Sequence, residues 1–184
     1  MVSAVSYTVL MPQTNRLHLP SAPVKQQLDG RDIWNELRSE VEADFFTLGY
    51  TGRKINDIVT TLKTYKVRTL VDIRRNPVSM YRPELSKSNL ARLLFSHGID
   101  YSHLPELGVP RDIRAKAIET GTRDVIWEWY DNMITSLIRW NLHFFLNGFE
   151  HPVALMCTEI DPHECHRHRL SLALEGKGMR GFEI

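Results

Sequence analysis

Short apolar runs alternate along this chain with longer segments in which apolar residues recur every three or four positions. The short runs lie at residues 45–48, 68–73, 99–104, 153–157 and 182–184. The periodic segments, typical of amphipathic helices, lie at residues 56–65, 86–97, 112–119, 123–146 and 162–175. Strands that alternate with helices at this spacing favour right-handed βαβ crossovers. We therefore predict an α/β fold: a mostly parallel central sheet of four to five strands, flanked by helices in a Rossmann-like three-layer sandwich.

The first part of the chain lacks this regularity. Residues 1 to about 30 contain three prolines and have weak periodicity, as expected of an irregular arm. Residues 31–43 have the apolar spacing of a short helix. We predict that residues 1–44 form an N-terminal arm with a short helix and that residues 45–184 form a single α/β domain.

The composition is that of an ordinary globular protein. The 184 residues are 42% hydrophobic and 24% charged, which fits one domain with a proper core. The net charge of +1 excludes a strongly basic, histone-like binder and leaves room for a local basic patch. No apolar run has the length of a membrane span, and the first eleven residues lack the features of a secretory signal. Two cysteines favour a reducing, cytoplasmic location with free thiols. The sequence does not indicate an oligomeric state.

Polar loops follow four of the predicted strands, at residues 49–53, 72–82, 103–109 and 157–167. The carboxyl ends of parallel strands meet at one edge of a sheet, and ligands of such sheets bind there. We therefore expect the four loops to form one polar site.

The segment 157–167 holds both cysteines of the chain, Cys157 and Cys165. Asp161 followed by proline predicts a helix start, which puts Cys165, His166 and Arg167 in or near the first turn. Backbone N–H groups and the helix dipole favour anions there, and they also favour a thiolate. The segment could therefore bind an anion, carry a nucleophilic cysteine, or do both. The alternative for Cys157 is a small residue of the core.

Several residues of this segment are potential metal ligands: Cys157, His163, Cys165, His166 and His168. Their spacing matches no C-x-x-C pair and no two-histidine helical zinc motif. We therefore expect no metal, and no motif in the chain indicates another cofactor.

The loop after the second strand is rich in arginine. Asp72 and Arg74 point to the same side of a strand and form either a pair that orders the loop or part of a binding site. Arg74, Arg75 and Arg82, with Tyr81 beside them, make up a positive loop suited to phosphates and nucleobases. A solvated surface loop would look the same.

Two further loops are less informative. Gly49–Arg53 is a tight strand-to-helix turn, or it brings backbone N–H groups to a ligand. After the third strand, Glu106 or His103 could serve as a general acid or base, although a histidine at a strand end is more often simply hydrogen-bonded.

Taken in order, these motifs resemble those of the uncharacterised family known as domain of unknown function 488. The similar stretches are residues 47–53, 70–74, 82–87, 98–108, 157–159 and 165–167. The chain departs from the family pattern at Leu85, where an aromatic residue is usual. The resemblance implies an α/β domain with a shared polar site, and it supplies no reaction. It carries over these motif positions: Asp72, Arg74, Tyr81, Glu106, Cys157, Glu159, Cys165, His166 and Arg167.

The leading hypothesis is an enzyme that acts on an anionic, phosphate-bearing substrate, either a nucleotide or a nucleic acid. Its candidate catalytic groups are Asp72 or Glu159 as acid or base and Cys157 or Cys165 as nucleophile. Its candidate substrate-binding residues are Arg53, Arg74, Tyr81, Arg82, Glu106, His166 and Arg167. One alternative is a non-catalytic module that binds nucleic acid or nucleotides. The other is rhodanese-like sulfur transfer through a cysteine, since the strand 70–74 resembles one in rhodaneses.

Overall fold

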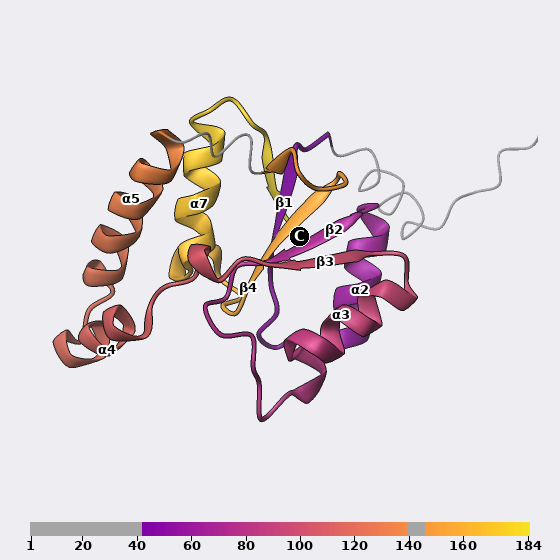
Figure 1. The fold of residues 1–184 in the computed structure, drawn as a ribbon, viewed down its shortest axis with the longest axis horizontal. Helices are drawn as coiled ribbons and strands as arrows, with labels where there is room; N and C mark the ends of the chain where they lie inside the picture. Colours follow the sequence, from indigo (N-terminus) through magenta and orange to yellow (C-terminus); the bar gives the residue numbers. More distant parts are fainter. Residues whose placement is uncertain (1–41, 140–145) are drawn as a thin grey trace, which may run out of the picture.

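The computed structural model describes residues 42–139 and 146–184. Five parallel strands form one sheet in the order β3-β2-β4-β1-β5 (Figure 1). The strands are β1 (Phe45–Gly49), β2 (Thr69–Asp72), β3 (Asp100–His103), β4 (Val153–Cys157) and β5 (Gly181–Glu183). The prediction of a parallel α/β sheet is confirmed.

Helices cover both faces of this sheet (Figure 1). They are α2 (Ile55–Thr64), α3 (Lys87–Ser96), α4 (Arg111–Thr120), α5 (Asp124–Arg139) and α7 (His166–Glu175). Single 3₁₀ turns lie at Pro83–Leu85, Pro105–Leu107 and Pro162–Glu164. The predicted helix at residues 31–43 lies almost wholly outside the described residues, as do residues 140–145 of the predicted long helix. The division into an arm and a domain therefore stays a prediction.

Alternation along the strands produces two cores, one on each face. Side chains of successive strand residues point to opposite faces, so Phe45 and Phe46 of β1 enter different clusters. Phe45 packs in the cluster that includes Tyr130 of α5 and Leu170 of α7. Phe46 packs in the cluster with residues of α2 and α3. The result is the predicted three-layer arrangement.

The register brings four carboxyl ends to one edge of the sheet. Gly49 pairs with Cys157, and Asp72 pairs with Met156 and with His103. β4 lies between β1 and β2. The chain leaves β1 and β2 toward α2 and α3 on one face, whereas it leaves β4 toward α7 on the other. The loops therefore diverge around β4, which is where ligands bind in open α/β sheets.

The predicted helix at 162–175 is divided in two. Asp161 caps only the short turn, because its carboxylate accepts the N–H of His163 at 2.8 Å. Cys165 is then extended, with φ −124° and ψ 141°, and α7 begins at His166. Cys165 is therefore the N-cap of α7 rather than a residue of its first turn.

Within the part of the chain that the structure describes, every helix is too short or too polar to cross a bilayer.

Candidate functional site

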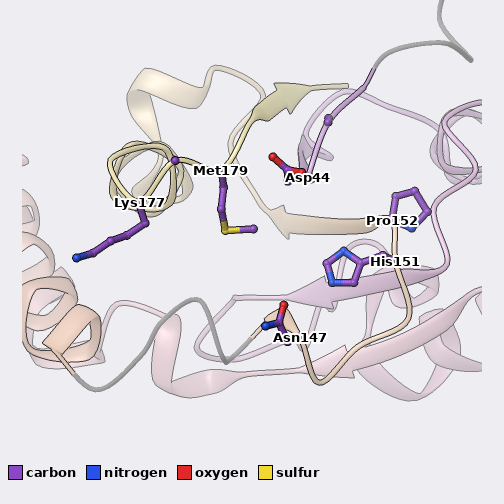
Figure 2. Close-up of a pocket in the computed structure, with 8 residues that line it drawn as sticks. Asp44, Asn147, His151, Pro152, Lys177 and Met179 are labelled. Carbon is purple, nitrogen blue, oxygen red and sulfur yellow. The ribbon is translucent and has the colours of Figure 1, made fainter.

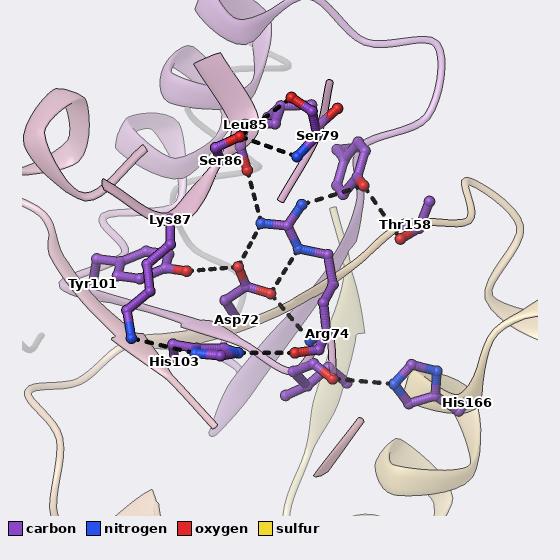
Figure 3. Close-up of polar contacts among 12 residues, drawn as sticks. Asp72, Arg74, Ser79, Leu85, Ser86, Lys87, Tyr101, His103, Thr158 and His166 are labelled. Carbon is purple, nitrogen blue, oxygen red and sulfur yellow. Dashed lines mark hydrogen bonds and ion pairs between the residues drawn. The ribbon is translucent and has the colours of Figure 1, made fainter. Parts of the chain in front are cut away.

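A buried ion pair organises the loop after β2 (Figure 3). The Arg74 guanidinium donates to both carboxylate oxygens of Asp72, through Nε at 2.8 Å and Nη2 at 2.6 Å. The backbone N–H of Arg74 adds a third bond at 3.1 Å. The Tyr101 hydroxyl donates to Asp72 at 2.7 Å, while Arg74 also donates to the Leu85 carbonyl at 2.8 Å and to the Tyr50 hydroxyl at 3.3 Å. The pair joins β2, β3 and the loops after β1 and β2.

The two charges of this pair neutralise each other inside the protein. The contacts with Asp72 raise the pKa of Arg74 above its ordinary value even though burial acts against them. Burial, reinforced by Asp72, raises the pKa of Tyr101. The geometry matches the expectation of an Asp–Arg pair that orders the loop. Binding of a substrate by Arg74 stays a prediction, and it would require the guanidinium to leave a bidentate partner.

Two histidines hold the backbone that leaves β2 (Figure 3). The ring Nε2 of His103 lies 2.9 Å from the carbonyl oxygen of Arg74. The ring Nε2 of His166 lies 3.3 Å from the carbonyl oxygen of Ile73. Lys87 Nζ lies 3.4 Å from the other ring nitrogen of His103. The segments around β2, β3 and α7, far apart in the sequence, therefore meet at this edge.

A cluster of two cysteines and one histidine lies at the end of β4, on the opposite face of the sheet from the ion pair: the thiols belong to the core against α5 and α7, whereas the pair contacts residues of the core against α2 and α3. One ligand atom from each of Cys157, Cys165 and His166 lies within 4.8 Å of the others. The Cys157 sulfur is 3.7 Å from either ring nitrogen of His166 and 3.5 Å from Oε2 of Glu159. Both cysteines are free thiols, 0% and 1% exposed. The cluster has the chemistry of a reactive thiol or of a metal site.

The pKa values of the two thiols are shifted in opposite directions. The hydrogen bond from Cys157, helped by His166, lowers the pKa of Cys165 to about 3 against the effect of burial. Burial, followed by the contact with Cys165, raises the pKa of Cys157 well above its usual value. Cys157 therefore keeps its proton and shares it with the Cys165 sulfur. Burial also raises the pKa of Glu159.

Arg167 holds the loop after β4 in place. Its side chain is 0% exposed. The guanidinium donates to the carbonyl oxygens of Glu159 and, at 2.8 Å, of Ile160, and to the carboxylate of Glu183 at 2.7 Å. Contacts with Glu183 raise the pKa of Arg167 although burial opposes them. This arginine therefore ties α7 to β5 and to residues 157–165 between β4 and α7, which are called the cysteine loop below.

The other predicted binding residues lie around this centre and are more exposed. Arg53 donates to the carbonyl oxygen of Ile184 at 2.9 Å. Arg82 pairs with Glu84 at 2.9 Å. Tyr81 is 99% exposed, and Glu106 is exposed on its 3₁₀ turn. Whether any of them contacts a substrate stays a prediction.

Close approach of the loops explains two glycines. A Cβ atom at Gly49 would collide with the backbone of Glu159, and one at Gly108 would collide with the backbone of Arg75. Only a residue without a side chain lets these loops pack so tightly. Gly49–Arg53 thus makes a tight turn beneath the cysteine loop.

Sequence reasoning missed three residues of this site: Tyr50, Tyr101 and Glu183. Tyr50 and Tyr101 lie within stretches that resemble the family, and each follows or lies in a strand that points at the polar edge. That position was the available signal. Glu183 lies on β5, and its role depends on the fold bringing β5 next to β1.

A pocket of about 430 Å³ lies at the opposite, amino-terminal edge of the sheet (Figure 2). It opens beside the residues that precede β1 and β4, away from the predicted site. Its lining residues are Ala43, Asp44, Asn147, His151, Pro152, Lys177, Gly178 and Met179.

Comparison with known proteins supplies a family and no activity. No curated protein and no solved structure matches the chain. A family model, Domain of unknown function DUF488, matches residues 54–174, which is well over half of the chain and includes most of the site just described. This protein belongs to the DUF488 family.

Proposed function

We propose that this protein binds a phosphate-bearing ligand, a single strand of nucleic acid, on the loop that follows β2 and along the adjoining helix α3. The observation that carries the proposal is a fully exposed aromatic side chain among arginines and a lysine. This surface comprises residues 75–92, which are the loop after β2 and the first part of α3, and is called the basic loop below.

The basic loop exposes apolar side chains that a solvated loop has no reason to carry. Tyr81 is 99% exposed, Met80 is 89% exposed and Val78 is 66% exposed. Adjacent exposed apolar residues, rimmed by polar ones, mark interaction sites. A tyrosine ring is a stacking platform for a base, and every base has a face to offer it.

The charge of the basic loop suits a polyanion. Its cations are Arg75, Arg82, Lys87 and Arg92, and its one acid is Glu84, which is paired with Arg82. Arg75, Lys87 and Arg92 are exposed to solvent. Phosphates neutralise such cations with release of counterions, which favours binding at low salt.

A strand fits this surface better than a mononucleotide does. The cations extend from the end of β2 along α3, a helix of ten residues and therefore about 15 Å long. A hollow of about 520 Å³ follows the same helix, lined by Glu84, Asn89, Arg92, Leu93 and Ser96. Cations spread over this length match successive phosphates rather than one.

The proposal moves the binding role away from two of the arginines that the sequence suggested. Arg74 and Arg167 are buried, and their guanidinium groups already meet carboxylates and carbonyls. Asp72 and both cysteines are buried as well. The accessible part of the edge therefore supports binding more than it supports catalysis.

Fluorescence anisotropy with labelled single-stranded DNA and RNA, and with duplex DNA, tests the proposal. We expect tighter binding of single strands than of duplex, with affinity falling steeply as salt rises. Tyr81→Ala should weaken binding about 5- to 150-fold, because stacking contributes about 1–3 kcal/mol per base.

Charge reversal supplies the control. Lys87→Glu should weaken binding and flatten its salt dependence, whereas Lys177→Glu, at the exposed amino-terminal edge, should leave binding unchanged. Absence of salt-dependent binding by the wild type would overturn the proposal, as would equal losses in the two lysine variants.

A further inference from the structure

The geometry of the cysteine cluster points to a second site with different chemistry: we propose that Cys157, Cys165 and His166 bind a Zn²⁺ ion. The inference does not depend on nucleic-acid binding, because the residues belong to the buried end of β4 and the start of α7 rather than to the basic loop.

The three side chains converge on one point from two elements. Cys157 is the last residue of β4, Cys165 is the N-cap of α7 and His166 is the first residue of that helix. One ligand atom from each lies within 4.8 Å of the other two. All three residues are at least 97% buried. Two sulfurs and an imidazole nitrogen gathered in a dry site are the ligand set that zinc prefers.

The surroundings orient these ligands as the outer shell of a metal site does. The backbone N–H of Arg167 points at the Cys165 sulfur over 3.5 Å. Nε2 of His166 lies 3.3 Å from the carbonyl oxygen of Ile73. If Nε2 carries the proton and donates it to that carbonyl, Nδ1 keeps a free electron pair that can bind the metal. A histidine ligand that donates its other ring N–H to a backbone carbonyl is the usual arrangement.

A fourth ligand is close at hand. Oε2 of Glu159 lies 3.5 Å from the Cys157 sulfur, and Glu159 is half-buried in the same loop. Its carboxylate, or a water molecule, would complete a tetrahedron. Zn²⁺ binds both sulfurs as thiolates, so the proton that the two sulfurs share is released and the two negative charges neutralise the ion.

The expectation of no metal rested on sequence spacing. Seven residues separate the two cysteines, and the histidine directly follows the second one. This spacing matches no zinc knuckle because the three ligands come from the end of a strand and the start of a helix. The 3₁₀ turn at Pro162–Glu164 and the extended backbone of Cys165 fold the chain back, so that the start of α7 faces the end of β4.

The test begins with the wild-type full chain, reduced and stripped with a chelator. We expect it to take up one equivalent of Zn²⁺, and Co²⁺ in its place should give the thiolate charge-transfer and tetrahedral ligand-field bands. Zn²⁺ should displace Co²⁺, abolish those bands and raise Tm. Wild-type protein that takes up neither ion, or that shows only octahedral Co²⁺ bands, would overturn the proposal.

Variants then locate the ion. Cys157→Ser and Cys165→Ser should each lose the charge-transfer intensity of one thiolate and weaken the affinity for Zn²⁺ at least tenfold, and His166→Gln should weaken it too. His163→Gln and His168→Gln are the matched controls. These two rings pack against each other outside the cluster, with their centroids 4.4 Å apart. Metal that survives loss of both cysteines but not of His163 would place the ion on that outer pair and contradict the proposal. The wild-type spectrum decides the question even if a cysteine variant fails to fold.

Discussion

At the scale of single residues, the Asp72–Arg74 pair is the feature on which the polar edge depends. Both side chains are buried, and every polar atom of the pair has a partner. Removal of one partner leaves the other charge uncompensated in a place that water does not reach. Breaking a buried pair in this way costs about 3–5 kcal/mol, far more than the pair contributes when it is intact.

We therefore predict that Asp72→Ala lowers the free energy of unfolding by about 3–5 kcal/mol, measured by urea denaturation. Asp100→Ala is the matched control, because Asp100 is an exposed aspartate on the neighbouring strand and such substitutions change stability by about 0.5 kcal/mol or less. The double variant Asp72→Ala/Arg74→Ala should lose less stability than the two single losses added together. Additive losses would show that the two groups do not act as a pair.

Residues two apart on an extended chain share a face, and this rule predicted that Asp72 and Arg74 lie on the same side, either as a pair that orders the loop or as part of a binding site. The rest of the network was beyond the sequence. Tyr101 reaches Asp72 because β3 lies beside β2 in a particular register, and the Leu85 carbonyl reaches Arg74 from a loop. The sequence signal for an ion pair can therefore be local, whereas its supporting partners come from segments that only the tertiary fold brings together.

At the scale of elements, close packing between loops fixes the cysteine cluster. Gly49, the last residue of β1, approaches the backbone of Glu159, and Gly108, in the loop after β3, approaches the backbone of Arg75. Neither neighbouring backbone can move away without loss of other bonds. Arg167 holds the loop that contains Glu159, and the Asp72–Arg74 pair holds the loop that contains Arg75.

We predict that Gly49→Ala and Gly108→Ala each destabilise the protein by about 1–3 kcal/mol or more, because overpacking forces backbone shifts. Gly176→Ala is the control, since Gly176 has helical dihedral angles and its added Cβ would approach other atoms no closer than 3.3 Å. Thermal unfolding followed by circular dichroism would measure all three. If Gly176→Ala is as harmful as the other two, close packing of the loops is not the cause.

Elements were predicted more reliably than their ends. All five strands follow from short apolar runs, and the helices at 56–65, 86–97 and 112–119 follow from apolar periodicity; both signals depend on neighbours in the sequence. The start of α7 did not follow, because Asp161 and Pro162 give the same local signal for a single turn and for a long helix. The backbone of Cys165 is extended there, in a segment packed against β4, and sequence periodicity does not report that packing.

At the scale of the whole molecule, the order of the strands distributes stability unevenly. β4 is the fourth strand of the chain and the central strand of the sheet, where it pairs with β1 on one side and β2 on the other. β5 is a strand of three residues at the edge, paired only with β1. Sequence patterns identified both strands, but a parallel pattern gives no strand order, since order is set by which crossover packs on which face.

This order predicts the pattern of hydrogen exchange. Exchange of the amides of β4 requires separation from two neighbours, so their protection should approach the free energy of global unfolding. Amides of β5 should exchange through local fraying, at a lower cost. Exchange measured by NMR or mass spectrometry at several urea concentrations separates the two, because exchange through global unfolding depends on urea and exchange through fraying hardly does.

Zn²⁺ at the end of β4 should slow exchange in the cysteine loop and leave β3 unchanged. Urea-independent exchange in β4 would mean that the centre of the sheet opens locally, and the cysteine cluster would then not be the rigid, preformed site that its burial indicates.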